Sequence, residues 1–287
     1  MKQYIKRITE ALKCRVLPPR LFIRSIYRKR TGKKLNLSSP KTFSEKIQWL
    51  KLYYKNPLLT RMADKAESKK IVKERVGPEY VIPSFKVYNR ADDINHSELP
   101  EQFALKATHG SGWNIIETSK ESISEKEIRD YFRYWLKKSY YIGSKEWAYK
   151  HIQPRVVCEE LIFNADGTLP EDYKFFCFNG TPTYVQVDHG RFEKHTRSFY
   201  DAEWNKMPFS IGYPLEETVA EKPRNLEKMF EIAAVLSEEL PFLRVDMYNV
   251  NGKIYIGELT CYPGNGLERF SEERWDHILG EKLNLDK

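Results

Sequence analysis

Two segments carry apolar side chains at helical spacing directly after a capping box. Thr42 and Glu45 open the first, and Ser124 and Glu127 open the second, with the side chains spaced to cap the first turn. A repeat of about 3.6 residues predicts helices from both starting points and over residues 59–75 and 226–240. The apolar faces of the two capped helices are Phe43, Ile47 and Leu50, and then Ile128, Tyr131, Phe132, Trp135 and Leu136.

Short runs rich in aromatic and β-branched residues lie between these helices and end at turn residues. The dipeptides Asn179-Gly180 and Asn251-Gly252 favour two-residue hairpin turns, so neighbouring strands are expected to run antiparallel. The pattern predicts an α+β fold with mainly antiparallel sheets. The predicted strands cover residues 80–88, 103–107, 114–118, 155–163, 172–179 and 183–188, and a final pair beginning at Arg244 and Ile254.

The register of the final strand pair determines which carboxylates meet. A strict two-residue loop places Asp246 opposite Gly257, whereas a three-residue loop, or a bulge with a left-handed Gly252, places Asp246 opposite Glu258. Only the second register separates polar from apolar side chains, so we predict it. One face then carries Arg244, Asp246, Glu258 and Thr260, and the other carries Val245, Met247 and Leu259.

Carboxylates that face each other across a strand pair repel unless a positive charge lies between them. A divalent cation would offset the repulsion between Asp246 and Glu258, and oxygen ligands suit magnesium. An exposed Asp–Glu pair without a ligand is the alternative. The spacing of the residues alone leaves both interpretations open.

A glycine-containing loop follows the strand that carries Lys106. Its sequence, HGSGW over residues 109–113, lets backbone N–H groups approach a phosphate without obstruction from Cβ atoms. The spacing is neither that of a P-loop nor that of a dinucleotide fold. The loop is therefore either a phosphate contact or an ordinary turn between two strands.

Length and composition indicate a folded chain with a sizeable core. The chain has 287 residues, of which 41% are hydrophobic and 14% aromatic, enough for two or three packed lobes. Four widely spaced cysteines form no CxxC pair and indicate reduced thiols. No apolar run approaches the roughly 20 residues that span a bilayer, so we expect a cytoplasmic protein.

Positive charge is concentrated at the N-terminal end. Residues 1–34 contain twelve Lys or Arg and one acid, a charge of +11, so the remainder carries about −3 of the net +8. Peripheral contact with the anionic inner face of a membrane is one interpretation of this segment. A solvated extension packed on the body is the other. Nucleic-acid binding is not expected, because no nucleic-acid module is recognisable.

Taken in order, six segments of the chain resemble the TupA-like proteins of the ATP-grasp superfamily. The resemblance extends over roughly residues 38–270. It implies a basic extension (1–37), an N-terminal region (38–102), a lid subdomain (103–162) and a catalytic subdomain (163–287), with two α+β lobes gripping ATP. The segments are residues 63–69, 104–112, 157–162, 172–180, 244–246 and 257–264.

The resemblance also implies nucleotide contacts. Lys69 and Lys106 match the two lysines that hold the phosphates, and Asp172 takes the place of the ribose-binding carboxylate. The mobile loop that closes over the phosphates corresponds to His109, Gly110, Ser111 and Gly112. The hinge whose backbone reads the adenine edge corresponds to Glu159, Glu160, Leu161 and Ile162.

For the reacting end of the site, the resemblance implies a magnesium centre. Asp246 and Glu258 match the metal ligands, and Arg244 matches an arginine near the transferred phosphate, where it would act in catalysis together with Lys106. Thr260 stands where ATP-grasp ligases usually have asparagine. A hydroxyl is a weaker ligand than an amide oxygen, so a second magnesium would be held less tightly.

A cationic segment over residues 188–197 follows a predicted strand. Arginines and lysines bind carboxylates through charge-assisted hydrogen bonds, so the segment could grip an anionic substrate. A solvated basic loop is the alternative. With the family resemblance added, the expected anion contacts are Lys174, His189, Arg191 and Arg197.

The function implied by the resemblance is an ATP- and magnesium-dependent carboxylate–amine ligase. Such an enzyme would activate a carboxylate as an acyl phosphate and pass it to an amine. Among cell-surface polysaccharide genes, the substrates would be a free or lipid-linked sugar uronic acid and an amino acid or amine. Two alternatives stay open, a glycosyltransferase of polysaccharide synthesis and an ATP-grasp kinase acting on a non-carboxylate acceptor.

Overall fold

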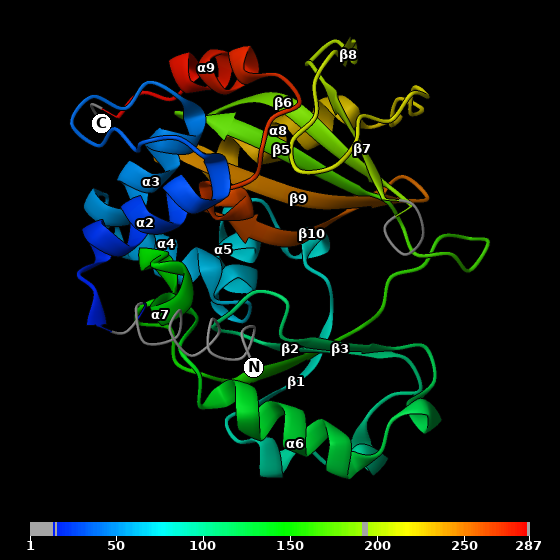
Figure 1. Ribbon diagram of the computed structural model, residues 1–287. Coiled ribbons are helices and arrows are strands. Elements are labelled where there is room, and N and C mark those ends of the chain that lie inside the picture. Colours follow the sequence, from blue (N-terminus) through cyan, green and yellow to red (C-terminus); the bar gives the residue numbers. More distant parts are fainter. Residues whose placement is uncertain (1–13, 15, 191–194, 286–287) are drawn as a thin grey trace.

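Two antiparallel sheets form the framework of the protein (Figure 1). The computed structural model describes residues 14, 16–190 and 195–285. The prediction of an α+β fold with antiparallel sheets is confirmed. The smaller sheet has the order β1-β4-β2-β3, with β1 Ser84–Tyr88, β4 Val156–Glu159, β2 Phe103–Ala107 and β3 Asn114–Glu117. The larger has the order β10-β9-β5-β6-β7-β8, with β10 Lys253–Thr260, β9 Phe242–Val250, β5 Asp172–Phe178, β6 Thr181–His189, β7 Thr196–Tyr200 and β8 Lys206–Met207.

The smaller lobe consists of the four-stranded sheet covered by helix α6 (Glu125–Leu136). The predicted capping box is present, because Ser124 accepts from the Glu127 backbone and Glu127 accepts from the Ser124 backbone. Ile128 and Phe132 are fully buried in a core shared with β1, β2 and β4. Strand β1 precedes residue 103, where the lid was predicted to begin, yet it pairs with β4 and belongs to this sheet.

The larger lobe has helices on both faces of its sheet. Adjacent residues of β5 point to opposite sides. On one side, Phe175 packs edge-on against Phe230 of α8 (Leu226–Ser237). On the other, the ring centroid of Phe176 lies 6.2 Å from that of Phe43 in α3 (Phe43–Tyr53). Helix α9 (Glu273–Lys282) packs beside α3, where the Asp276 carboxylate accepts from the Ser44 backbone N–H at 2.8 Å. The sheet is therefore buried between layers and forms a rigid base for the residues it presents.

The segment predicted as one helix over residues 59–75 is two helices. Helix α4 (Pro57–Ala63) ends before Asp64, and α5 (Glu67–Arg75) begins after it. The Asp64 carboxylate accepts from the backbone N–H groups of Ala66 and Glu67 at 2.9 and 3.3 Å, so it competes with continuation of the helix. The resulting corner directs Lys65 towards both sheets.

Two predicted strands are shorter in the structure. The first begins at Ser84, because residues before it form a 3-10 turn, η1 (Pro78–Tyr80). The strand predicted over 155–163 ends at Glu159, beyond which residues 160–163 pair with no neighbouring strand. Between the two sheets lie the five-residue helix α7 (Tyr140–Ser144) and a single turn, η5 (Trp147–Tyr149).

In the β9–β10 hairpin, Asp246 pairs with Glu258 as predicted, but the irregularity that produces this register lies at a different position. Asn251 and Gly252 form a tight two-residue turn with φ values of 52° and 77°. The extra residue lies further along, at Gly257, where a bulge shifts the register and brings Glu258 opposite Asp246. The prediction of a longer loop or a bulge at Gly252 was wrong. The predicted opposition of the carboxylates is confirmed.

The described part of the basic N-terminal extension packs on the body. Helix α2 (Pro19–Thr31) buries Ile23 and Tyr27 against Leu35 and Leu37, and a left-handed Gly32 ends it. Within the described ranges, no helix combines the length and the apolar character needed to cross a bilayer.

The contact between α9 and the start of α3 gives a test of the packing. A Cβ on Gly280 would lie 2.2 Å from the Lys41 carbonyl oxygen, so Gly280→Ala should lower the free energy of unfolding by about 1–3 kcal/mol. A Cβ on Gly143 in α7 meets no atom within 4 Å, and Gly143→Ala should leave stability unchanged or raise it. Urea unfolding of both variants measures the difference, and equal effects would contradict the packing described.

Candidate functional site

A cleft of about 490 Å³ lies between the two sheets. The smaller sheet contributes residues from β2, β3 and β4, and the larger contributes residues from β5, β9 and β10. The structure brings twelve of the predicted site residues to this cleft, which is large enough for a nucleotide-sized ligand. They are Lys106, Ser111, Gly112, Glu159, Glu160, Leu161, Ile162, Asp172, Lys174, Arg244, Asp246 and Glu258.

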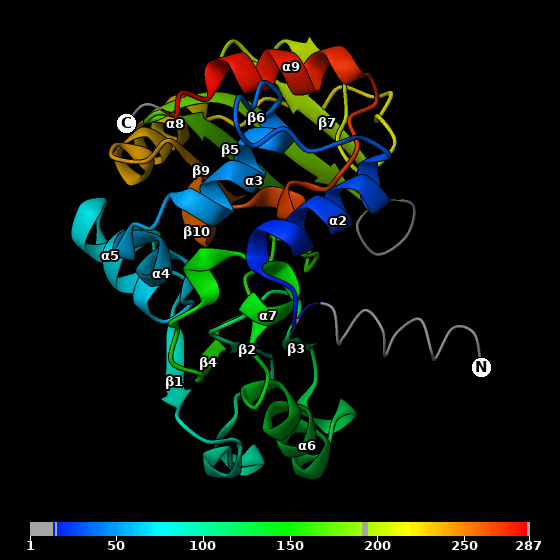
Figure 2. The same cartoon turned by 60° about the vertical axis from the view of Figure 1, so that its left-hand side comes forward.

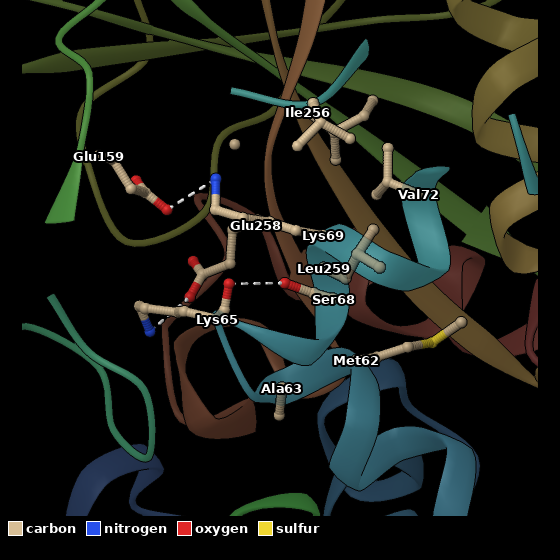
Figure 3. A pocket seen from close by; sticks show the side chains of 12 residues that line it. Met62, Ala63, Lys65, Ser68, Lys69, Val72, Glu159, Ile256, Glu258 and Leu259 are labelled. Atoms are coloured by element: carbon tan, nitrogen blue, oxygen red, sulfur yellow. Dashed lines mark hydrogen bonds and ion pairs between the residues drawn. The ribbon is translucent and has the colours of Figure 1, made fainter. Parts of the chain in front are cut away.

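Lys69 and Lys106, the two predicted phosphate lysines, meet at one carboxylate. Glu159, at the end of β4, accepts from Lys69 Nζ at 2.9 Å (Figure 3). It also accepts from Lys106 Nζ at 2.5 Å. Lys69 comes from α5 of the larger lobe, whereas Lys106 comes from β2 of the smaller one. Glu159 therefore joins the lobes. Lys106 lines the cleft, whereas Lys69 lines a smaller pocket that also includes Glu159 and Glu258.

Burial opposes charge on all three of these groups, and their mutual attraction favours it. Burial disfavours the Glu159 carboxylate, but Lys106 and Lys69 hold its pKa below the ordinary value. Burial acts most strongly on Lys106 and would lower its pKa, but Glu159, Glu258 and Asp172 together outweigh burial and raise the pKa. Burial dominates at Lys69 and lowers its pKa. The cluster carries one net positive charge when all three groups are ionised.

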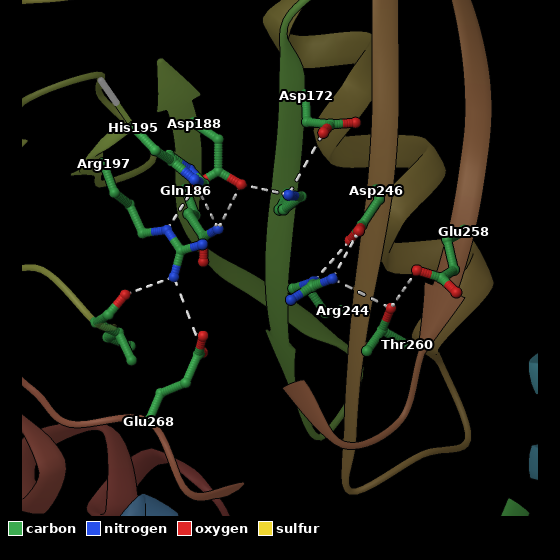
Figure 4. A network of polar contacts seen from close by, with 12 residues as sticks. Asp172, Gln186, Asp188, His195, Arg197, Arg244, Asp246, Glu258, Thr260 and Glu268 are labelled. Atoms are coloured by element: carbon green, nitrogen blue, oxygen red, sulfur yellow. Dashed lines mark hydrogen bonds and ion pairs between the residues drawn. The ribbon is translucent and has the colours of Figure 1, made fainter. Parts of the chain in front are cut away.

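Across the cleft, the carboxylates of Asp246 and Glu258 share one face of the β9–β10 hairpin with Arg244 and Thr260 (Figure 4). Arg244 donates to both Asp246 oxygens at 2.7 Å, in a bidentate pair. The Thr260 hydroxyl accepts from Arg244 at 3.3 Å and lies 3.4 Å from Glu258. Thr260 is thus oriented by its neighbours, although it does not line the cleft.

The electrostatic surroundings of the two carboxylates differ. Burial raises the pKa of Asp246 to about 6 even though Arg244 and Lys174 oppose the shift. Burial also acts on Glu258, but Lys65, Arg244 and Lys106 together hold its pKa below the ordinary value. An added cation on this face would stabilise the ionised form of Asp246, whose charge its present neighbours offset only in part.

Lys65 was missed by the sequence analysis. Its ammonium group lies 3.5 Å from Glu258 and donates to the Gly110 carbonyl at 2.6 Å, while its backbone N–H donates to Thr108. Lys65 therefore links the carboxylate face to the glycine loop of the smaller lobe. The signal was present, because Lys65 lies in the 63–69 segment that carries the family resemblance, but the helix predicted over 59–75 concealed the corner.

The glycine loop is divided between the cleft and the core. Ser111 and Gly112 line the cleft, whereas His109 and Gly110 do not. The His109 ring is buried, with Nε2 3.1 Å from the Trp135 carbonyl oxygen. The structure thus places His109 where it anchors the loop to α6, not among the lining residues.

Only part of the predicted anion-binding set lies at the cleft. Lys174 lines it and pairs with Asp188 and, at 3.4 Å, with Asp172. Arg197 instead is buried behind the cleft and donates to Asp188 at 2.6 Å (Figure 4), so its guanidinium is already occupied. His189 pairs with Glu171 and does not line the cleft. Arg191 lies outside the described residues.

The donor atoms on the carboxylate face suit magnesium, because they are all oxygen. Asp246 and Glu258 would provide the protein ligands, and the Thr260 hydroxyl lies beside them. Among residues 14, 16–190 and 195–285, no three or more His, Cys, Asp or Glu residues gather as a metal site. Magnesium would therefore need further oxygens from a ligand such as a phosphate, as is usual for this ion.

Comparison with known protein families gives a match to the TupA-like ATP-grasp model over residues 45–284. The chain belongs to this family. The match contains both lobes, the cleft and every predicted site residue. No functionally curated protein matches the chain.

Solved structures of ATP-grasp ligases resemble the protein at low identity. D-alanine–D-alanine ligase from Bacillus anthracis, complexed with ATP, is 18% identical to this protein, with a TM-score of 0.43. The match covers 72% of this chain and 56% of the ligase chain. The ligase PsnB, with Mg and ADP, is 11% identical with a TM-score of 0.40, covering 84% and 64%. Phosphoribosylamine–glycine ligase from Thermotoga maritima is 15% identical with a TM-score of 0.39, covering 73% and 51%. The chain thus spans less than two thirds of the length of these proteins.

The buried ion pairs of Asp188 give a pH-dependent test. Although burial opposes its charge, Lys174 and Arg197 hold the Asp188 pKa well below the ordinary value. Asp188→Asn would leave both cations without their main carboxylate, and the free energy of unfolding near neutral pH should fall by about 3–5 kcal/mol. The exposed Asp93→Asn should have little effect.

The sign of the pH dependence follows from linkage. A carboxylate with a depressed folded-state pKa stabilises the fold above its unfolded pKa of about 3.9, and less as the pH falls through the folded value. The difference between Asp188→Asn and the unsubstituted protein should therefore stay constant down to about pH 5 and shrink in more acidic solution. A difference that does not vary with pH in urea unfolding would contradict this assignment.

Proposed function

We propose that the protein is an ATP- and magnesium-dependent carboxylate–amine ligase. The observation that carries the proposal is the meeting, in one cleft, of the cations Lys65, Lys106 and Arg244 with the opposed carboxylates Asp246 and Glu258. Membership of the TupA-like ATP-grasp family supports ATP as the phosphoryl donor. Phosphoryl transfer depends mainly on positioning and charge stabilisation, and these residues can supply both.

The nucleotide would lie along the cleft from the β4 end to the β9–β10 hairpin. Residues 160–162 form no strand. The Glu160 N–H donates to the Pro83 carbonyl, so other backbone groups of this segment would contact an adenine edge, and Asp172 would accept from the ribose. Lys69 and Lys106 would exchange Glu159 for phosphate oxygens. Magnesium, when bound by Asp246 and Glu258, would offset charge on the phosphates and bring the transferring group into line.

The reaction would proceed in two transfers. An oxygen of the acceptor carboxylate attacks the γ-phosphorus, the bond to the β–γ bridging oxygen breaks, and ADP leaves. The amine then attacks the carbonyl carbon of the acyl phosphate, loses a proton, and expels inorganic phosphate. No nucleophile from the protein takes part. The glycine loop, which Lys65 holds against the carboxylate face, would keep water from the acyl phosphate.

The proposed acceptor is a sugar uronic acid of cell-surface polysaccharide synthesis, and the amine an amino acid or a related compound. Lys174 lines the cleft, unlike Arg197, and would contact an acceptor carboxylate by exchanging its pairing with Asp188 and Asp172 for the acceptor. The acceptor could be free or carried on a lipid. The latter would suit a cytoplasmic protein that contacts the inner face of a membrane.

A glycosyltransferase is a weaker candidate. All paired strands named in the described part of the chain are antiparallel, whereas nucleotide-sugar enzymes with a metal carboxylate pair would be expected to have a Rossmann-like parallel sheet. A kinase acting on a hydroxyl would use the same cleft, so the nature of the product must separate it from a ligase.

An assay with hydroxylamine as trapping nucleophile tests the proposal. ATP, magnesium and a panel of uronic acids should give ADP together with a hydroxamate, because hydroxylamine captures acyl phosphates. Formation of ADP with a phosphorylated sugar and no hydroxamate would favour the kinase. Consumption of a nucleotide sugar with ATP unchanged would exclude the ligase.

The carboxylate pair gives a sharper test within the same assay. Glu258→Gln keeps the shape of the side chain but removes the charge, so ADP formation should fall by at least about a hundredfold. The thermal midpoint should change little by comparison. Glu281→Gln on the exposed surface of α9 is the matched control and should retain full activity. Retained activity in Glu258→Gln would remove the metal assignment.

A further inference from the structure

Helix α2 bears a concave cationic surface that the cleft does not involve. A hollow of about 650 Å³ is lined by Arg24, Ser25, Arg28, Lys29, Lys34 and Leu35. Four of the six lining residues are cations, and none of them is acidic. Because like charges repel and opposite charges attract, such a surface favours an anionic partner.

Exposed apolar side chains lie on the same helix, towards its N-terminal end. Leu21 is 51% exposed, and Val16, just before the helix, is 75% exposed. Leu21 precedes Ser25 and Lys29 by one and two helical turns, so it continues the ridge that reaches the hollow. Apolar and cationic side chains on one exposed helix face are the pattern of helices that lie in a membrane interface.

The position of α2 on the body is fixed. Ile23 and Tyr27 are buried in its small core, and the Arg30 carbonyl accepts twice from the Arg269 guanidinium, at 3.1 and 2.9 Å. Figure 2 shows the helix along the outside of the larger lobe, beside α3. The helix backbone that carries the cations is therefore preformed, and little backbone entropy is lost when a partner binds.

We propose that this face of α2 docks on an anionic phospholipid bilayer, with lipid phosphates in the hollow of Arg24, Arg28, Lys29 and Lys34 and with Leu21 in the interfacial layer. A nucleic acid would use the cations but gain little from the exposed leucine. The docking does not depend on the ATP chemistry proposed above. If both hold, the bilayer would be the source of a lipid-linked acceptor.

Flotation of the full chain with vesicles tests the docking. Binding to phosphatidylcholine mixed with phosphatidylglycerol, and not to phosphatidylcholine alone, is expected, and binding should weaken as salt is added. Each cation near an anionic surface contributes roughly fivefold to binding, so the combined variant R24Q/R28Q/K29Q should bind roughly a hundredfold more weakly. Leu21→Gln should weaken binding by a smaller factor.

The control is K73Q/K137Q/K222Q, which removes the same charge from exposed positions elsewhere and should retain binding. Equal loss in both triple variants would mean that net charge alone attracts the protein, and the proposal would fall. It would also fall if R24Q/R28Q/K29Q bound vesicles like the unsubstituted chain, or if the protein bound RNA but no vesicles. ADP formation with a soluble acceptor should be the same in all variants, so failure of the ligase proposal would be seen separately.

Discussion

Repulsion between Asp246 and Glu258 is the constraint around which the protein is arranged. The bulge at Gly257 brings the two carboxylates onto one sheet face, where Asp246 is buried and Glu258 is half-buried, so water screens their charges less than at an open surface. Cations must therefore be brought to that face from other parts of the chain. Arg244 comes from the same strand as Asp246, and Lys65 from the corner between α4 and α5. Each of these cations contacts one of the two carboxylates, Arg244 contacting Asp246 and Lys65 contacting Glu258.

The same demand for charge balance joins the lobes. Lys65 contacts a β10 carboxylate and a carbonyl of the glycine loop, and Lys69 and Lys106 approach Glu159 from opposite lobes. The contacts at the cleft are thus mostly polar, while each lobe keeps its own apolar core. Ion pairs and hydrogen bonds from Lys65, Lys69 and Lys106 thus connect the two lobes at the cleft.

Local signals were read well from the sequence, and non-local ones were not. Both capping boxes, the antiparallel sheets and the opposition of Asp246 to Glu258 follow from patterns within a few residues. The position of the bulge could not be read, because it depends on Gly257 lying against the Tyr248 ring across the hairpin. Arg197 looked like a substrate contact, since its buried partner Asp188 lies on another strand. Lys65 was missed because the helical spacing of apolar residues continues from α4 into α5. The spacing therefore hides the corner that the Asp64 side chain creates between the two helices.

The shared carboxylate of Glu159 has a consequence for selectivity. Because Glu159 already satisfies Lys69 and Lys106, any phosphate that binds them competes with a counterion tethered within the protein. A ligand with one negative charge would merely replace an existing ion pair and gain little. A triphosphate brings several charges and can occupy both ammonium groups at once. In the proposed reaction the product diphosphate is less charged and would compete less well, so the return of Glu159 to its lysines would assist product release. Glu159 would thus be a counterion within the protein that the incoming phosphates displace from Lys69 and Lys106.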